Sequence, residues 1–303
     1  MENGRVTVIL HKHSGFLFNR KPSNFVVRHM EPMLELARQG TSSLRVIHDR
    51  TEVFSGIEVI EPEFEKFLQV AKERRKLHKI ASRWCIQMKA HFAAADIGEK
   101  SRTLYPELAP EAALILETNS KEPRTIVNHF NYSPLEAAIE INFAIVSEIR
   151  TMKAIGRGDM KDAVEHAIRY HDHFASSMLI RDEELAVQIH SIRAQYPKDP
   201  LVVLRSCNHA HIGELFEDRG IDAVVEVEER ERTFRDEAVE ELAVRGLSME
   251  ERRRLAIMHI AFTALVNKHQ AQERPGLRNF CRQQVLNQYD NLFKEIYGHP
   301  PHQ

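Results

Sequence analysis

The sequence predicts a helix-rich α/β protein with a mostly parallel sheet, histidine clusters at strand ends and a C-terminal helical tail. Short β-branched runs alternate with amphipathic helical stretches up to Val227, which is the pattern of an α/β fold. After Val227 the strand signals stop and charged helical sequence continues. The 17 histidines include two groups that directly follow predicted strands. These groups indicate where to look for a site.

The first predicted segment is a β-α-β unit. Arg5 to Leu10 (RVTVIL) reads as a strand, because it is short and rich in β-branched residues. His11 and His13 follow in a polar loop. A helix is then expected from Glu31 to Arg38, and a second strand from Ser43 to Ile47.

The middle of the chain is expected to hold two more strands and several helices. The strands are Ile57 to Ile60 and Ala112 to Leu116, with a long amphipathic helix between them and an Asn-, Pro- and His-rich loop after them. Ser133-Pro134-Leu135-Glu136 predicts a helix start, because Ser can cap, Pro fits the first turn and Glu can reach back to the cap. The helices expected from there on are Ser133 to Lys153, Asp159 to Phe174 and Met178 to Gln195.

The last strands close the predicted core. Leu201 to Leu204 (LVVL) reads as the clearest buried strand, and the polar segment Arg205 to His211 follows it. A short helix and a final strand, Ala223 to Val227, come next. We therefore expect an α/β core over residues 1–227 and a helical extension over 228–303, in which Ser248 and Glu251 form a capping box. This extension is a candidate surface for a homodimer.

Composition narrows the classes of function. The 42 basic and 44 acidic residues leave a net charge of -2, which gives no reason to expect a nucleic-acid partner. No apolar run approaches the roughly 18 residues of a membrane span, and the N-terminus has no signal-peptide pattern. Cys85, Cys207 and Cys281 lie too far apart to suggest a cysteine-rich zinc site. We expect a cytoplasmic protein with no membrane partner.

The two histidine clusters are the strongest chemical signal. Open α/β sheets place ligand sites at the carboxyl ends of their strands, where both clusters are predicted. His11 and His13 share one face of an extended segment, so both imidazoles can turn to one metal ion or substrate. His209 and His211 repeat the spacing after the strongest strand. A metal-bound hydroxide and a histidine-activated water both stay open, as do solvated loop or helix-capping histidines.

Roles can be assigned to these residues if the chain is an enzyme. His209 is the candidate base, and Glu117, at the end of a predicted strand, is the candidate acid, with Glu58 as its competitor. Arg181 is the candidate partner of an anionic group. A divalent metal ion is a candidate cofactor, and its candidate ligands are His11, His13 and His211.

The segment from Arg181 to Gly220 resembles the TraB/Tiki, ChaN-like and erythromycin-esterase-like superfamily. That family shows an Arg-(Asn/Asp)-x-x-(Met/Leu)-Ala-x-x-Ile helix, then a strand, a histidine motif and a helix ending in Gly. The matching residues here are Arg181, Asp182, Leu185, Ala186, Ile189 and His209. Val8 and Ser206 stand where the family's Gly-x-x-His motif has glycine. The resemblance implies a hydrolase-like site that uses His11 or His13, His209, Arg181 and an acid, with a small molecule or a peptide as substrate.

Two other interpretations stay open. The segment HKHS at His11 to Ser14 is similar to the opening motif of PHP-type metal-dependent phosphoesterases, which would make Ile47-His48-Asp49 a second metal-binding patch and Glu58 a bridging acid. A non-enzymatic haem- or metal-binding protein would use the same histidines as ligands only. Such a protein needs no base, acid or substrate pocket.

Overall fold

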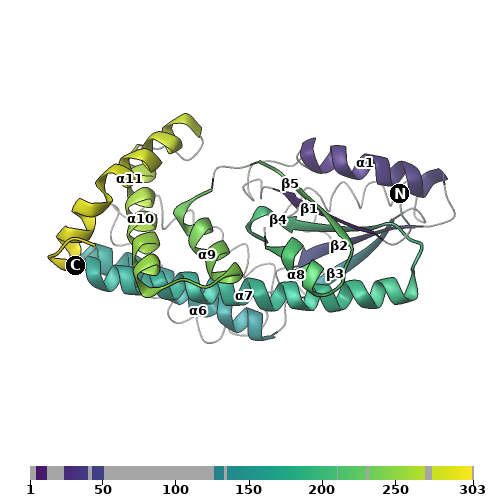
Figure 1. Ribbon diagram of the computed structural model, residues 1–303, viewed down its shortest axis with the longest axis horizontal. Coiled ribbons are helices and arrows are strands. Elements are labelled where there is room, and N and C mark those ends of the chain that lie inside the picture. The colour runs from purple at the N-terminus through teal and green to yellow at the C-terminus, as the bar shows by residue number, and fades with distance from the viewer. Residues whose placement is uncertain are drawn as a thin grey trace, which may run out of the picture. The chain divides into compact units, whose positions relative to one another are not determined.

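The structure is a computed structural model that describes residues 5–11, 24–39, 43–50, 126–132, 135–209, 211–229, 232–269 and 275–301. Its strands are β1 (Val6–His11), β2 (Leu44–Arg50), β3 (Ile126–Tyr132), β4 (Leu201–Ser206) and β5 (Ala223–Val227). They form one sheet in the order β3-β2-β4-β1-β5, and every pair of neighbours is parallel (Figure 1). The predicted α/β class with a parallel sheet is confirmed.

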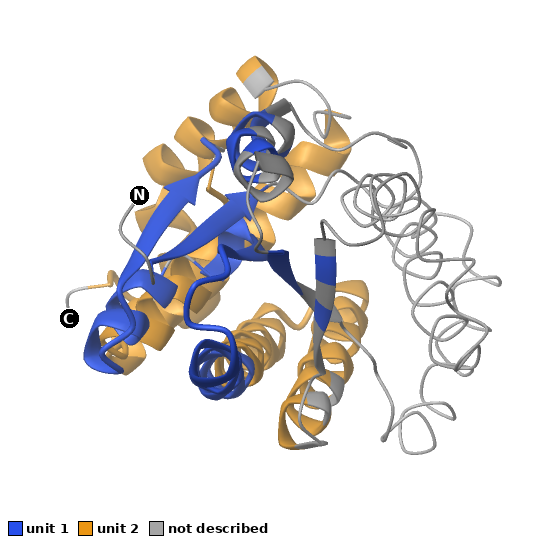
Figure 2. Cartoon of the chain, turned by 90° about the vertical axis from the view of Figure 1, so that its right-hand side faces the viewer, with its two compact units in different colours: residues 1–54, 87–135, 179–230 blue, residues 55–86, 136–178, 231–303 orange. Residues whose placement is uncertain are grey.

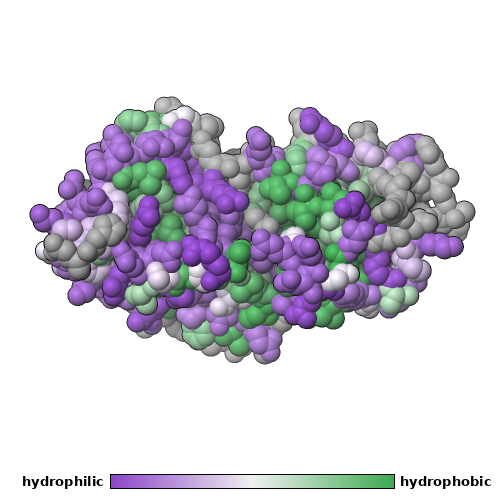
Figure 3. Space-filling view, in the orientation of Figure 1, coloured by the Kyte–Doolittle hydropathy of each residue, from purple (hydrophilic) through white to green (hydrophobic). Residues whose placement is uncertain are grey.

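Helices cover both faces of this sheet. Alternate residues of β1 point to opposite faces, as the two-residue period of a strand requires. Val6, Val8 and Leu10 pack with the end of α7 (Met160–Gln195) and with α8 (Ile212–Asp218). Ile9 packs instead with α1 (Asn24–Gln39). On the face of the molecule drawn in Figure 3, apolar residues gather over the strands of this sheet.

The chain divides into two compact units, which Figure 2 shows in different colours. Unit 1 comprises residues 1–54, 87–135 and 179–230, and contains the sheet. Unit 2 comprises residues 55–86, 136–178 and 231–303. The predicted helical extension therefore shares its unit with residues 136–178, which the sequence assigns to the core. Helix α7 contributes to both units, with the change at Met178 and Leu179.

Unit 2 is helical within its described residues. Its helices are the first part of α7 together with α6 (Leu135–Arg157), α9 (Phe234–Val244), α10 (Met249–Lys268) and α11 (Pro275–Tyr297). One apolar cluster joins α6, α7, α10 and α11, and a second joins α9, α10 and α11. The predicted capping box of Ser248 and Glu251 is present at the start of α10, and Thr233 forms a second one with Asp236.

Two predictions about the elements are wrong. The stretch expected as a loop after residue 116 contains β3, whose sequence IVNHFNY carries β-branched and aromatic residues between its polar ones. The separate helices expected over 159–174 and 178–195 are one helix, because no Gly or Pro interrupts the sequence between them. The strands expected at 57–60 and 112–116 lie outside the described residues.

None of the described helices combines the length and the apolar character needed to cross a membrane.

Candidate functional site

One histidine of each predicted cluster, His11 and His209, lies at the end of one of two neighbouring strands. β1 and β4 are parallel neighbours, and His11, the last residue of β1, is in register with Ser206, the last residue of β4. The strand β4 continues into a short 3₁₀ turn, Cys207–His209, which places His209 just beyond the carboxyl end of the sheet. His11, His209 and His211 are all buried. His11 and His209 therefore lie at the same edge of the sheet.

A buried carboxylate from α7 joins this edge. The side chain of Asp182 is 0% exposed, and its Oδ2 atom lies 2.6 Å from Nδ1 of His209. The same oxygen lies 3.0 Å from Nε2 of His211. The other oxygen, Oδ1, lies 2.9 Å from Nη2 of Arg205, a residue of β4 whose side chain is 1% exposed. One carboxylate is thus shared by two imidazoles and a guanidinium.

The charges of this cluster favour an ionised Asp182 and a neutral His209. Burial alone would raise the pKa of Asp182, but the hydrogen bond from His209 and the charge of Arg205 hold it well below its usual range. Burial lowers the pKa of His209, although the Asp182 carboxylate opposes this effect. An ionised carboxylate only accepts hydrogen bonds, so Nδ1 of His209 carries the proton and donates it. The Nε2 atom then keeps its lone pair.

Arg181 lies beside this arrangement. It precedes Asp182 in α7 and is buried, and its backbone carbonyl accepts a hydrogen bond of 3.1 Å from Nη2 of Arg205. Its positive charge is among the causes that lower the pKa of His209, after burial and Arg205. The charge of Arg181 therefore acts on His209.

His211 lies at the start of α8, on the same carboxylate as His209. It is the residue before the first turn of α8, but its side chain makes no capping hydrogen bond there. Its Nε2 atom faces Asp182. Among the described residues neither ring nitrogen of His211 has a partner in hydrogen-bond geometry, so its approach to Asp182 is a close contact.

Several predicted site residues cannot be placed. Glu117, its competitor Glu58 and His13 lie outside the described residues. Within the described part of the chain, no group of three or more His, Cys, Asp or Glu side chains is arranged to hold a metal ion. The assignment of His11, His13 and His211 as ligands of a divalent metal ion stays a prediction.

Two members of the cluster have no role assigned from the sequence. Asp182 appears there only as part of a family resemblance, and Arg205 only as the start of a polar segment. A signal for Asp182 does exist, because Asp182, Leu185, Ala186 and Ile189 follow the spacing of one helix face. An acid in an otherwise apolar stripe indicates a buried charge that needs a partner.

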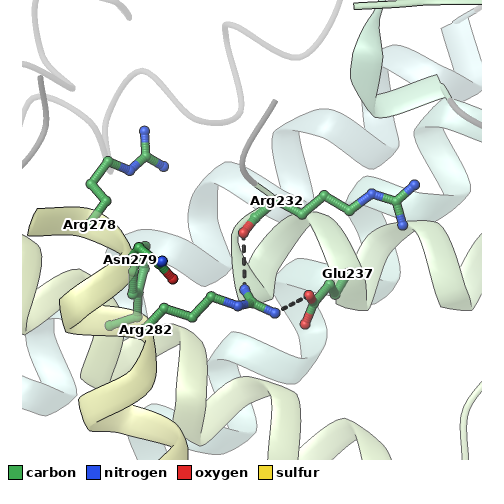
Figure 4. Close-up of a pocket in the computed structure, with 6 residues that line it drawn as sticks. Arg232, Glu237, Arg278, Asn279 and Arg282 are labelled. Atoms are coloured by element: carbon green, nitrogen blue, oxygen red, sulfur yellow. Dashed lines mark hydrogen bonds and ion pairs between the residues drawn. The ribbon is translucent and has the colours of Figure 1, made fainter. Parts of the chain in front are cut away.

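A cavity of about 310 Å³ lies elsewhere, in unit 2. Figure 4 shows that the guanidinium of Arg282 reaches the carboxylate of Glu237 and the backbone carbonyl of Arg232. The guanidinium of Arg232 points away from this contact (Figure 4), and it pairs with Glu240 at 3.2 Å. The charged side chains around this cavity therefore do not point to one common position where a ligand could bind. None of the predicted site residues lines the cavity.

Comparisons with family models, with curated proteins and with solved structures found no match for this chain. The case for function therefore rests on the cluster around Asp182.

Proposed function

We propose that the chain is a hydrolase in which His209 acts as the general base on a water molecule. The observation that carries this proposal is the 2.6 Å contact between Asp182 Oδ2 and His209 Nδ1 in a buried site. A carboxylate on Nδ1 holds an imidazole in one tautomer, with the lone pair on Nε2. A histidine that acts as a general base requires this tautomer, because its Nε2 atom must accept the proton.

The proposed step moves one proton. Nε2 of His209 takes a proton from water as the water oxygen forms a bond to the electrophilic atom of the substrate. His209 then carries a positive charge, which the neighbouring Asp182 carboxylate stabilises. The positive charge of Arg181, which acts on His209, would favour the negative charge that develops on the substrate. The bond between the electrophilic atom and the leaving group then breaks, and His209 gives its proton to the leaving group and is neutral again.

The neutral state of His209 supports this role. A base must be unprotonated before the reaction, and burial lowers the pKa of His209 below its usual value. Its neutral form is thus present at neutral pH. The resemblance of residues 181–220 to the TraB/Tiki superfamily supports the same assignment of His209 and Arg181. Three expectations stay predictions. They are a small-molecule or peptide substrate, a location in the cytoplasm, and a homodimer formed through the helical tail.

The test is a screen of the full chain against chromogenic esters, peptides and phosphoesters, followed by substitution. His209→Ala should lower the rate on the order of 10² to 10⁴-fold and leave the fold intact. His190→Ala is the matched control, because His190 is an exposed histidine of the same helix and unit as Asp182, and its Nε2 atom hydrogen bonds to the Arg219 carbonyl. Full activity in His209→Ala would place the chemistry elsewhere.

The same experiment separates a metal-dependent reaction from a metal-free one. If His209 binds a metal ion, His209→Ala lowers the metal content of the purified protein, and a chelator mimics the substitution in the wild type. If His209 is the base, the chelator has no effect on the rate. A phosphoesterase of the PHP type would show the metal-dependent result with phosphoester substrates only. A protein that binds metal but turns over no substrate would contradict the hydrolase proposal.

A further inference from the structure

One side of α6 carries exposed apolar residues next to charged ones. Phe143 is 49% exposed and Ile139 is 40% exposed, although both side chains are large and apolar. They belong to a row of residues that follow one another at alternating steps of three and four, so the row lies on one face of the helix. We call this row the α6 stripe, and all its members are exposed or half-buried: Glu136, Ile139, Phe143, Val146, Arg150, Lys153 and Arg157.

The ring of Phe143 is held in place from the side. Its centroid lies 5.3 Å from that of the His173 ring, on α7. Nδ1 of His173 also lies 2.8 Å from Oε2 of Glu140, which precedes Phe143 on the same helix. An exposed side chain that is already ordered loses little entropy when a partner covers it. Phe143 is therefore suited to be the aromatic anchor of an interface.

The charges of the α6 stripe favour a second copy of the same helix as the partner. The stripe begins with the acidic Glu136 and ends with basic residues, from Arg150 to Arg157. Two copies of α6 that run parallel would place like charges opposite each other, which is unfavourable. Two copies that run antiparallel, related by a twofold axis, place the acidic end of each copy opposite the basic end of the other.

The stripe has an antiparallel register in which its centre is apolar. Phe143 then lies opposite Val146 of the second copy, and the twofold axis places Val146 opposite the other Phe143. One step outward, Ile139 lies opposite Arg150 of the second copy. The methylene stem of an arginine can cover an apolar side chain while the charge stays in water. The exposed apolar residues of the stripe are thus all covered.

The same register pairs the charges at the ends. Because the steps of three and four match on the two helices, Glu136 lies opposite Lys153 of the second copy, once at each end of the pair. Arg157 lies one turn beyond Lys153, and it already pairs with Asp162 at 2.8 Å. The register therefore leaves no like charges of the stripe opposite each other.

We propose that the α6 stripe is the interface of a homodimer in which two copies of α6 pack antiparallel about a twofold axis. A single pair of helices is a smaller contact than the interface of a permanent dimer, so this dimer dissociates on dilution. The stripe is distinct from the helical tail, residues 228–303, which the sequence suggests as a dimer surface. The inference does not depend on the proposed hydrolase, because it is tested through the oligomeric state.

The first test measures the molecular mass of the full chain by sedimentation equilibrium at a series of concentrations. We expect a monomer–dimer equilibrium for the wild type. Phe143→Ser should raise the dissociation constant on the order of 10²-fold, because the twofold axis removes the anchor from both copies. The matched control is Phe280→Ser, on α11 of the helical tail, because Phe280 is 50% exposed. This variant should dimerise like the wild type.

The second test concerns the charges. Glu136→Lys should weaken the dimer about tenfold, because it places two like charges at each end of the pair. Adding Lys153→Glu to Glu136→Lys exchanges the two charges, and the double variant should recover the dissociation constant of the wild type. Weakening of the dimer by Glu136→Lys without recovery in the double variant would contradict the proposed register.

The third test uses a carbodiimide, which joins a carboxylate to an amine that contacts it. Glu136 and Lys153 of one chain are about 26 Å apart along α6, at about 1.5 Å per residue. A link between them, identified by mass spectrometry of the digested protein, therefore forms only between two copies. We expect this link in the wild type and its loss in Phe143→Ser.

A full chain that stays monomeric at every concentration would overturn the inference. A dimer that Phe280→Ser weakens and Phe143→Ser does not would assign the interface to the helical tail instead. A dimer without the link between Glu136 and Lys153 would overturn the antiparallel arrangement. If Phe143→Ser does not fold by circular dichroism, Glu136→Lys, at an exposed position, and the link in the wild type still decide.

Discussion

Unit 2 contains a pair of histidines that should make its stability depend on pH. Nε2 of His171, on α7, lies 3.0 Å from Nδ1 of His259, on α10, and His171 is 1% exposed. Burial lowers the pKa of His171, and the positive charges of His259 and Arg235 lower it further. Burial and then Arg235 lower the pKa of His259 to about 4, against the opposing effect of Asp236. Tyr170, beside His171, also interacts with Arg235 and with Glu148 of α6.

The size and sign of the change in stability with pH follow from the pKa of His259. The unfolded chain binds a proton on this residue below about pH 6.5, but the folded chain does so only near pH 4. Between these values the unfolded state binds more protons, so the free energy of unfolding falls as the pH falls. A pKa lower by about 2.5 at about 1.4 kcal/mol per pH unit corresponds to about 3.5 kcal/mol in full. About 3 kcal/mol of this is lost by pH 4, where His259 of the folded chain is half protonated.

The experiment compares wild type with His259→Gln in denaturant unfolding followed by far-ultraviolet circular dichroism. Other groups also titrate in acid, so the quantity of interest is the difference between the two proteins at each pH. At about pH 7 the variant should be less stable by about 1 kcal/mol, because it loses one hydrogen bond. On going to about pH 4 it should lose about 3 kcal/mol less than the wild type. His190→Gln, at an exposed position, should follow the wild type, and an equal pH dependence for His259→Gln would refute the reasoning.

Two further predictions concern the backbone and the helical tail. Gly220→Ala should lower the free energy of unfolding by about 1 kcal/mol in denaturant, because Gly220 has a φ of +68° that residues with a side chain avoid. Gly156→Ala, in α6, is the control and should be neutral or stabilising. Equal effects at both positions would contradict this account. Truncation after Glu229 removes α9, α10 and α11 and uncovers the apolar cluster of α6 and α7, so light scattering should detect aggregation while the circular dichroism of the sheet persists. A truncated chain that scatters no more light than the full chain would argue against this packing.

The apolar pattern is sufficient to predict most of the described sheet. β1, β4 and β5 are short β-branched runs with clear polar ends, and the structure places each of them within one or two residues of the expected bounds. The pattern does not predict β3, because β3 lies at the edge of the sheet, where Asn and His interrupt the apolar residues. Its partner β2 is expected to end at Ile47 but continues to Arg50 beside it.

The candidate site is only partly predictable for a related reason. The sequence singles out His209 and Arg181, but it assigns no acid to them within the described residues, because Asp182 reads as an ordinary helix residue unless its apolar neighbours are considered. A buried Asp182 requires a buried cation. The described strands offer two such arginines, Arg45 in β2 and Arg205 in β4. Both interrupt an apolar run, so the pattern alone does not choose between them.

The register of the sheet determines which of the two arginines can reach Asp182. Arg45 is opposite Leu201 at the amino end of β4, whereas Arg205 lies four residues further along, next to the carboxyl end of the same strand. At about 3.3 Å per residue the two positions are about 13 Å apart, so one carboxylate cannot serve both arginines. Arg45 has its own partner in Asp199, 2.7 Å away, before the start of β4. Arg205 is therefore the arginine that reaches Asp182 at the histidine edge. Strand order and register, which depend on contacts between distant parts of the chain, decide which charges meet.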